Sequence, residues 1–285
     1  MLYQNKKTYP RVFGLGKELS SWSALRLAVQ KLNTKIWYQL VSLKAPDDLT
    51  FMNFGYAALD ARGHTLELES SEESNRFPTQ LYHRVASAVD LRGKDVLEVG
   101  SGRGGGSAFI GKRLGPRAMT GVDFSAKAVA FCQKRHGNKS LTFQHGDAES
   151  LPFAAESFDA VVNVESCHCY VSVDRFLGQV TRVLRPGGHL LFADDGPKVY
   201  LDALREHFMR SGLVMVEEEN ITPNVIRALE FTSDRNRASI QKEVPRGFRS
   251  IFRNFAGIHG TPVFDAFRTE EWLYMRYVLQ KPYES

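Results

Sequence analysis

A glycine-rich turn at residues 100–106 is the first place in this sequence where the residue types indicate ligand chemistry. The apolar run VLEV at 96–99 leads into GSGRGGG. Glycines let the chain turn tightly and let its backbone come close to a ligand. The spacing E-x-G-x-G-x-G, with no Lys-Ser/Thr pair after it, differs from that of a phosphate-binding loop. Hydrolysis of a nucleoside triphosphate is therefore not expected. Glu98, two residues before the first glycine, can meet a cation or a backbone amide.

Two further acidic positions follow at the spacing of a nucleoside-binding fold. Asp123, with Phe124 after it, ends a predicted second strand 25 residues after Glu98, where a carboxylate can accept both hydroxyls of a ribose. Asp147-Ala148 ends a predicted third strand, where a carboxylate can accept from an exocyclic adenine amine. The glycine turn and the two carboxylates therefore predict a nucleoside-containing cofactor.

The segment NVESCHCY at 163–170 carries the best candidate for a general base, His168. It follows a predicted fourth strand, so it lies at the carboxyl end of the sheet, where ligands bind in this fold. An imidazole there can take a proton from a hydroxyl nucleophile. Asp194 or Asp195, at the end of a predicted fifth strand, can orient the imidazole. The alternative is that His168 only packs beside the cofactor.

A metal site is not expected. Cys167 and Cys169 point to opposite faces if the chain is extended, and the sequence has no C-x-x-C pair. Asp194-Asp195 is compatible with magnesium but gives only a weak signal.

Short apolar runs alternate with helical segments from residue 94 onward, which predicts a parallel α/β sheet. The expected strands are 94–100, 118–125, 141–148, 158–165, 188–195, 213–221 and 273–281, and the expected helices are 105–114, 125–136, 172–184 and 199–210. Pro186-Gly187-Gly188 is expected to turn the chain into the fifth strand. Residues 222–270 form a long, mostly helical and basic insertion before the last strand, and insertions of this length are usually functional.

The residues before the sheet have a different character. Residues 1–45 hold eight basic residues and one acid, and 19–43 show the apolar spacing of an amphipathic helix. Residues 47–73 are acidic and read as a loop or lid, with Asn53, Phe54 and Tyr56 placed either to close over the cofactor or only to pack. Residues 77–89 look helical and carry Tyr82 and His83. We therefore divide the chain into 1–75, a basic helix and lid segment, and 76–285, the cofactor-binding domain.

The ordered set of motifs resembles the class I S-adenosylmethionine-dependent methyltransferases over residues 90–200. Over residues 50–282 it is similar to the phthiotriol/phenolphthiotriol dimycocerosate methyltransferases, through NRFPTQLYHR, VGSGRGGGSAF, NVESCHCY, VLRPGG and FAGIHGTP…YMRYVLQK. The resemblance implies a Rossmann-like fold, with a seven-stranded, mostly parallel sheet, an N-terminal helical extension and the insertion. The loop begins Gly-Ser-Gly-Arg, which departs from the Cys-Gly-His version of that family and leaves the acceptor unassigned.

The resemblance also implies the cofactor, S-adenosyl-L-methionine, and methylation of a hydroxyl on a lipid-like or polyketide molecule, with His168 and Asp194 as the catalytic pair. The residues assigned to the cofactor are Tyr56, Glu98, Gly100, Ser101, Gly102, Gly104, Asp123, Phe124, Asp147, Ala148, Asn163 and Glu165. Those assigned to the acceptor are Tyr82, His83, Tyr170, Phe231 and Phe252.

Other reactions stay open at this point: methylation of carbon or nitrogen, a cyclisation on the same fold, or cofactor binding without catalysis. The expected partner is a hydrophobic small molecule. With 37 basic and 32 acidic residues, and the excess confined to the N-terminal segment, the chain is not expected to bind nucleic acid. The N-terminal helix could contact a membrane, and the insertion could form a homodimer interface. No secretory signal, bilayer-spanning run or disulfide framework is expected, which predicts a cytoplasmic protein, in peripheral contact with a membrane if the helix binds one.

Overall fold

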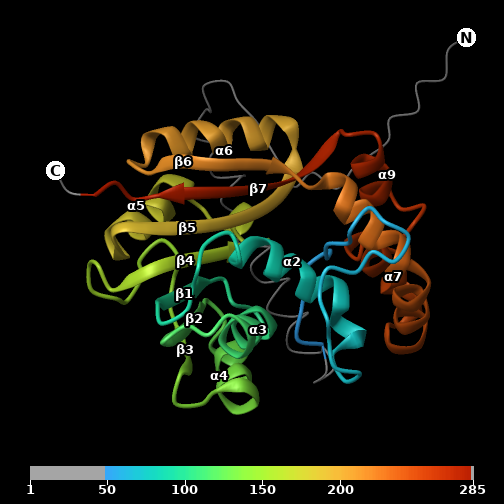
Figure 1. Cartoon of the computed structure of the whole chain (residues 1–285). Coiled ribbons are helices and arrows are strands. Elements are labelled where there is room, and N and C mark those ends of the chain that lie inside the picture. Colours follow the sequence, from blue (N-terminus) through green and yellow to red (C-terminus); the bar gives the residue numbers. More distant parts are fainter. Residues whose placement is uncertain (1–48, 284–285) are drawn as a thin grey trace, which may run out of the picture.

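The computed structural model describes residues 49–283, in which seven strands form one sheet in the order β3-β2-β1-β4-β5-β7-β6 (Figure 1). The parallel strands are β1 (Asp95–Val99), β2 (Ala118–Asp123), β3 (Leu141–His145), β4 (Phe158–Val164) and β5 (Leu184–Pro197). Because β2 and β4 lie on opposite sides of β1, the carboxyl ends of β1 and β4 border a crevice, as in doubly wound sheets that bind nucleotides.

Helices connect β1 to β2, β2 to β3 and β4 to β5, as the sequence predicts. They are α3 (Gly105–Arg113), α4 (Ala126–His136) and α5 (Val173–Val183), with the 3-10 turn η2 (Cys167–Cys169) between β4 and α5. The Ser125 and Ser172 hydroxyls accept from the first turns of α4 and α5, which fixes where these two helices begin. Before the sheet lie η1 (Glu73–Asn75) and α2 (Arg76–Ala86).

The last strand enters the sheet between two strands that precede it. After α6 (Lys198–Arg210), β6 (Val214–Asn220) forms the sheet edge, and β7 (Trp272–Gln280) pairs antiparallel with both β5 and β6. Between β6 and β7 lie α7 (Thr222–Glu243), η3 (Arg246–Phe248), α8 (Arg249–Phe255) and α9 (Pro262–Arg268). This is the predicted helical insertion, and Figure 1 shows α7 and α9 together at one end of the sheet.

One boundary is wrong in the prediction from sequence. The segment Arg185-Pro186-Gly187-Gly188 does not precede the fifth strand but belongs to it, because β5 already begins at Leu184. Phe158 pairs with Leu184 and Ala160 with His189, so the ladder contains an irregularity that absorbs the glycines. Gly187 has φ +77°, and its N–H donates to the Lys281 carbonyl, which ties the irregularity to the end of β7.

Apolar side chains fill both faces of the sheet. One cluster joins the sheet to α2, α3, α4, α7 and α9, and the other joins it to α5 and α6. Alternate residues of a strand serve opposite clusters: Tyr274 and Val278 of β7 belong to the first, Met275 and Tyr277 to the second. The sheet is therefore the middle of three layers, and only the ends of its strands are left to build a site.

The acidic segment 49–72 forms no helix or strand and packs along α2 and α7 as a loop. The Tyr56 N–H donates to the Phe77 carbonyl, and the Ala57 N–H donates to the Asn224 carbonyl. The predicted amphipathic helix at 19–43 lies outside the described residues, and the boundary at residue 75 stays a prediction. Among residues 49–283 no helix combines the length and apolarity needed to cross a bilayer.

Candidate active site

A pocket opens at the carboxyl ends of β1, β2 and β4. It has about 1100 Å³ of space between protein atoms, part of it open to solvent, against roughly 300–1,000 Å³ for small-molecule sites. The glycine turn forms its floor, and residues 50–53 of the loop line one side. The predicted residues in its wall are Tyr82, Gly100, Ser101, Gly102, Asp123, Phe124, Asp147, Ala148, Glu165 and Tyr170.

The backbone of the glycine turn is fixed by close packing and by one hydrogen bond to Asp123. Gly100 has φ +78°, and a Cβ there would lie 2.5 Å from the Ser166 hydroxyl oxygen, so a larger residue cannot replace it without strain. The Gly102 N–H donates to Asp123 Oδ2 (2.8 Å). The Ser101 hydroxyl in the pocket wall is buried and has no hydrogen-bond partner among residues 49–283. A buried hydroxyl normally has a partner, so Ser101 is suited to a polar ligand atom.

Asp123 and Asp147 reach the pocket from the ends of β2 and β3. The two oxygens of Asp123 accept the N–H groups of Gly102 and Ser125, each at 2.8 Å, which fixes the carboxylate in one orientation. Burial raises the pKa of Asp123, and these two bonds oppose the shift. Each oxygen retains a lone pair for a further donor. Asp147 Oδ1 accepts the Glu149 N–H (2.9 Å) and is held in a similar way.

Glu98 lies beneath the pocket rather than in its wall. The side chain is fully buried, and its oxygens accept from the Tyr82 hydroxyl (2.7 Å) and the Ser107 hydroxyl. Burial raises the pKa of Glu98 to about 7, although both hydrogen bonds favour the ionised form. In this structure Glu98 therefore joins α2 and α3 to β1 and supports the glycine turn from below.

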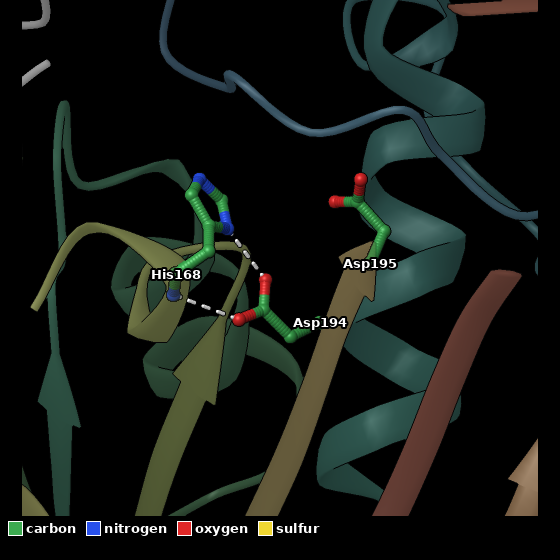
Figure 2. Close-up of side chains that lie close together, drawn as sticks. All are labelled: His168, Asp194 and Asp195. Carbon is green, nitrogen blue, oxygen red and sulfur yellow. Dashed lines mark hydrogen bonds and ion pairs between the residues drawn. The ribbon is translucent and has the colours of Figure 1, made fainter. Parts of the chain in front are cut away.

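His168 and Asp194 form a hydrogen-bonded pair beside the pocket (Figure 2). Asp194 Oδ1 lies 2.7 Å from His168 Nδ1, and Asp194 Oδ2 accepts the His168 backbone N–H (2.9 Å) and the Tyr200 hydroxyl (2.8 Å). The sequence left the choice between Asp194 and Asp195 open, and the structure pairs His168 with Asp194. Burial would lower the pKa of His168, but the Cys169 sulfur and the Asp194 carboxylate raise it well above its usual value.

Two more carboxyl groups surround this pair. Asp195 Oδ2 accepts from the Trp272 indole (2.5 Å), and Glu165 Oε1 accepts from the Phe54 N–H and the Tyr274 hydroxyl, both at 2.9 Å. Burial raises the pKa of Asp195 to about 6 and that of Glu165 well above its usual range. Glu165 also has φ +47°, uncommon for a residue with a side chain. His168 is therefore surrounded by three carboxyl groups, those of Asp194, Asp195 and Glu165.

The sequence does not predict a metal site, but the structure brings together three side chains that could be metal ligands. One atom each from His168, Asp194 and Asp195 lies within 4.8 Å of the others, a spacing that a cation can bridge. Each of the three side chains already has a hydrogen-bond partner within the described part of the chain. Hydrogen bonding thus accounts for the cluster without a cation.

The remaining predicted residues lie outside the pocket wall. Asn163 is buried and donates to the Val99 carbonyl and to the Ser166 and Tyr170 hydroxyls, so it braces the glycine turn. Gly104 begins α3 in a left-handed conformation. His83 packs edge-on against Phe109.

The other three residues assigned to ligands are Tyr56, Phe231 and Phe252. The Tyr56 backbone joins the loop to α2. Phe231 stacks on Phe77 and is 40% exposed, and Phe252 is half-buried on α8. Neither aromatic residue of the insertion lines the pocket.

Several residues of the site had no signal in the sequence. Thr50 and Met52 line the pocket from the loop, beside Phe51 and Asn53 of the predicted lid, and Trp272 and Tyr274 reach the carboxyl cluster from β7. The β7 residues are brought there by pairing with β5, where Asp195 lies opposite Tyr274. A sequence pattern could have placed them only if the partner and register of β7 had been known.

Comparisons with known proteins agree with this geometry. A family model described as a methyltransferase domain matches residues 97–192. The phthiotriol/phenolphthiotriol dimycocerosates methyltransferase of Mycobacterium leprae is 38% identical, over 91% of this chain and 96% of its own length. A fatty-acid O-methyltransferase of Mycolicibacterium smegmatis is 34% identical, over 91% and 94%.

A solved structure has the same fold. It is geranyl diphosphate C-methyltransferase from Streptomyces coelicolor A3(2) in complex with Mg²⁺, geranyl diphosphate and S-adenosyl-L-homocysteine. It superposes with a TM-score of 0.64 at 17% identity, covering 88% of this chain and 97% of that one.

Proposed function

The chain belongs to the family of the phthiotriol/phenolphthiotriol dimycocerosates methyltransferases, and we propose that it uses S-adenosylmethionine to methylate a hydroxyl group of a lipid-like or polyketide-type molecule. The observation that carries this proposal is the His168–Asp194 pair beside a nucleoside-type pocket. His168 of this pair would act as the base, and the pocket would bind the methyl donor.

The pocket residues fit the cofactor. Asp123, with both oxygens fixed, would accept the ribose hydroxyls, and Asp147 would accept the adenine amine. The partnerless Ser101 hydroxyl and the backbone of the glycine turn would meet the polar methionine end. When bound, S-adenosylmethionine supplies a methyl group activated by its sulfonium. The chain then has to hold the acceptor oxygen in line with that methyl and exclude water.

His168 is suited to remove the hydroxyl proton. Because Nδ1 is hydrogen-bonded to Asp194, the nitrogen that would face the acceptor is Nε2, which Figure 2 shows on the side of the ring away from Asp194. An alcohol oxygen becomes a better nucleophile as its proton is taken in the transition state. The ionised Asp194 would stabilise the imidazolium that forms, as the carboxylate does in hydrolase triads. Because the pKa of His168 is raised, the neutral, basic form of the imidazole becomes the main form only at a higher pH than for an ordinary histidine.

The acidic surroundings favour an alcohol over a carboxylic acid as the acceptor. The names of the two relatives point to different acceptors, one a phthiotriol and the other a fatty acid. A substrate carboxylate beside His168 would be repelled by the carboxyl groups of Asp194 and Asp195, and a protonated His168, which could offset this repulsion, could not act as the base. A neutral hydroxyl avoids that repulsion and can donate to either group.

The acceptor would reach the site beneath the loop and the insertion. Phe54 packs edge-to-face against Phe267 of α9, and its N–H is bonded to Glu165. The loop is thereby tied both to the insertion and to the carboxyl cluster. We propose the insertion, residues 222–270, as the cover of the acceptor site, with apolar side chains suited to a long hydrocarbon.

The test is an incubation with methyl-labelled S-adenosylmethionine and two acceptors of equal chain length, a long-chain diol and a fatty acid. Mass spectrometry would locate the label. Labelled ether from the diol, with little ester from the acid, is the expected result, and His168→Ala should abolish it. A labelled carbon or nitrogen, or preferential ester formation, would overturn the hydroxyl assignment. Binding of S-adenosylhomocysteine without transfer to any compound of a host lipid extract would point to the cyclase-type alternative.

A further inference from the structure

The outer part of the insertion, residues 235–255, has a composition unlike the rest of the described chain. We call it the basic tip. It holds six basic residues and one acid, Glu243, and it comprises the second half of α7, η3 and α8. The basic residues are Arg235, Arg237, Lys242, Arg246, Arg249 and Arg253. In Figure 1 α7 lies on the right, near α9, at the end of the sheet where β7 begins.

Among the described residues, no carboxylate pairs with the charges of the basic tip. Within residues 49–283, none of its six basic residues forms an ion pair, whereas Arg84 and Arg276 on nearby elements pair with Glu219. The hydrogen bonds made by the arginines of the tip go to backbone carbonyls. Arg235 donates to the Ser74 carbonyl, and Arg249 caps the end of α7 through the carbonyls of Gln241 and Val244. Carbonyl oxygens orient a guanidinium but leave its charge available to an anionic partner.

Apolar side chains stand among these charges. Phe248 and Ile251, three residues apart on η3 and α8, are each 52% exposed. Phe252 and Phe255, on the same short helix, are only partly exposed. Helix α8 therefore has both exposed and half-buried apolar positions, and the exposed ones are flanked by Arg246 and Arg253. Aromatic and aliphatic side chains bordered by Arg and Lys are typical of surfaces that enter the headgroup region of a membrane.

From these features we propose that the basic tip docks the enzyme on an anionic lipid bilayer, with Phe248 and Ile251 entering the headgroup region and Arg246 and Arg253 contacting lipid phosphates. The positive charge of the tip disfavours two other binding partners for this surface, residues 1–48 of the same chain and a second copy of the tip. Residues 1–48 hold eight basic and three acidic residues, so their net charge has the same sign as that of the tip and gives no attraction to it. A two-fold dimer through the tip would place two like-charged surfaces against each other. The inference is independent of which acceptor atom is methylated.

The test is co-sedimentation of the full chain with phosphatidylcholine vesicles that contain or lack phosphatidylglycerol. Binding is expected only to the anionic vesicles, and it should fall with added salt because the screening length shortens from about 10 Å at 0.1 M. Each basic residue near an anionic surface corresponds to about a fivefold change in partition. Arg246→Glu with Arg253→Glu should therefore lower vesicle binding by more than about 25-fold.

The matched control reverses two exposed charges on α4, Lys134→Glu with Arg135→Glu. This control variant should bind the anionic vesicles at least about tenfold more strongly than the variant with both tip arginines reversed. A third variant, Phe248→Ser with Ile251→Ser, keeps every charge and should also weaken vesicle binding. Thermal melting and S-adenosylhomocysteine binding report whether each variant is folded.

Two outcomes would overturn the proposal. If the tip variants bind vesicles as the wild type does, the contact lies elsewhere, for instance in residues 1–48. If the charge reversal abolishes binding but the serine variant does not, and the wild type binds a labelled nucleic acid duplex equally well, the tip is a polyanion site and not a membrane site.

Discussion

Replacing Asp194 by asparagine tests the proposed catalytic pair most directly, because the structure fixes how the new amide must be oriented. Asp194 Oδ2 accepts the His168 backbone N–H and the Tyr200 hydroxyl. The backbone N–H can only donate, so the amide oxygen of asparagine takes the Oδ2 position. The amide NH₂ then occupies the Oδ1 position, 2.7 Å from His168 Nδ1 in the wild type.

An NH₂ group facing Nδ1 makes that nitrogen an acceptor and places the ring proton on Nε2. The nitrogen proposed to take the substrate proton would then already carry one. General-base catalysis contributes roughly 10²–10⁴-fold, or about 2.7–5.4 kcal/mol of the barrier, and Asp194→Asn should lose most of it. Cofactor affinity should hardly change, since Asp194 does not line the cofactor pocket.

The assay is the turnover of a hydroxylated acceptor as a function of pH. In the wild type, turnover should rise as the pH passes the raised pKa of His168, because only the neutral imidazole acts as a base. In Asp194→Asn the carboxylate no longer raises that pKa, yet turnover should stay low at every pH because the tautomer is wrong. Tyr277→Phe, which removes a buried hydroxyl with no partner among the described residues, is the matched control and should be nearly neutral. Turnover within tenfold of the wild type, or a loss confined to KM, would refute the reasoning.

Three further predictions concern the same site. His168→Ala should lower turnover by about 10²–10⁴-fold with S-adenosylhomocysteine affinity nearly unchanged by calorimetry; a loss below tenfold would remove the base role. Asp123→Ala should weaken S-adenosylhomocysteine binding by about 10–100-fold, the worth of charge-assisted hydrogen bonds, and unchanged affinity would contradict the ribose assignment. Burial raises the pKa of Glu98 to about 7, so its contribution to stability is complete at low pH and lost as the pH rises through 7. Glu98→Gln should therefore be more stable than the wild type at pH 8, by up to about 3 kcal/mol, and not at pH 4; equal melting curves at pH 8 would contradict the raised pKa.

Local patterns predicted most of the sheet because each strand and helix of a doubly wound fold has its own signature. Strand β2 ends at Asp123 and α4 begins after Ser125, as the alternation of apolar runs and capping residues requires. The segment RPGG was wrongly predicted to precede the fifth strand, because contacts with other strands determine its structure. Glycine and proline usually mark a turn, but here the glycines are absorbed into β5 by pairing with β4 and by the bond from Gly187 to Lys281.

The candidate site was predictable only where its residues sit at strand ends in chain order. His168 and Asp123 follow from that rule. The buried place of Glu98 depends on hydroxyls from two different helices, Tyr82 and Ser107, and no spacing in the sequence links them. Trp272 is 77 residues from Asp195, and their contact depends on the antiparallel register of β7. Long-range pairing of this kind lies beyond what periodicity can predict.

The position of β7 has a consequence for how the chain is made. Strand β7 is synthesised after all the other strands, yet it lies between β5 and β6. Until it emerges from the ribosome, the apolar edge of β5 has no partner, and β6 cannot join the sheet. An unpaired apolar edge is prone to aggregation. The strand that ends this exposure also brings Trp272 and Tyr274 to the carboxyl cluster, so a nascent chain completes its sheet and the surroundings of His168 in the same event.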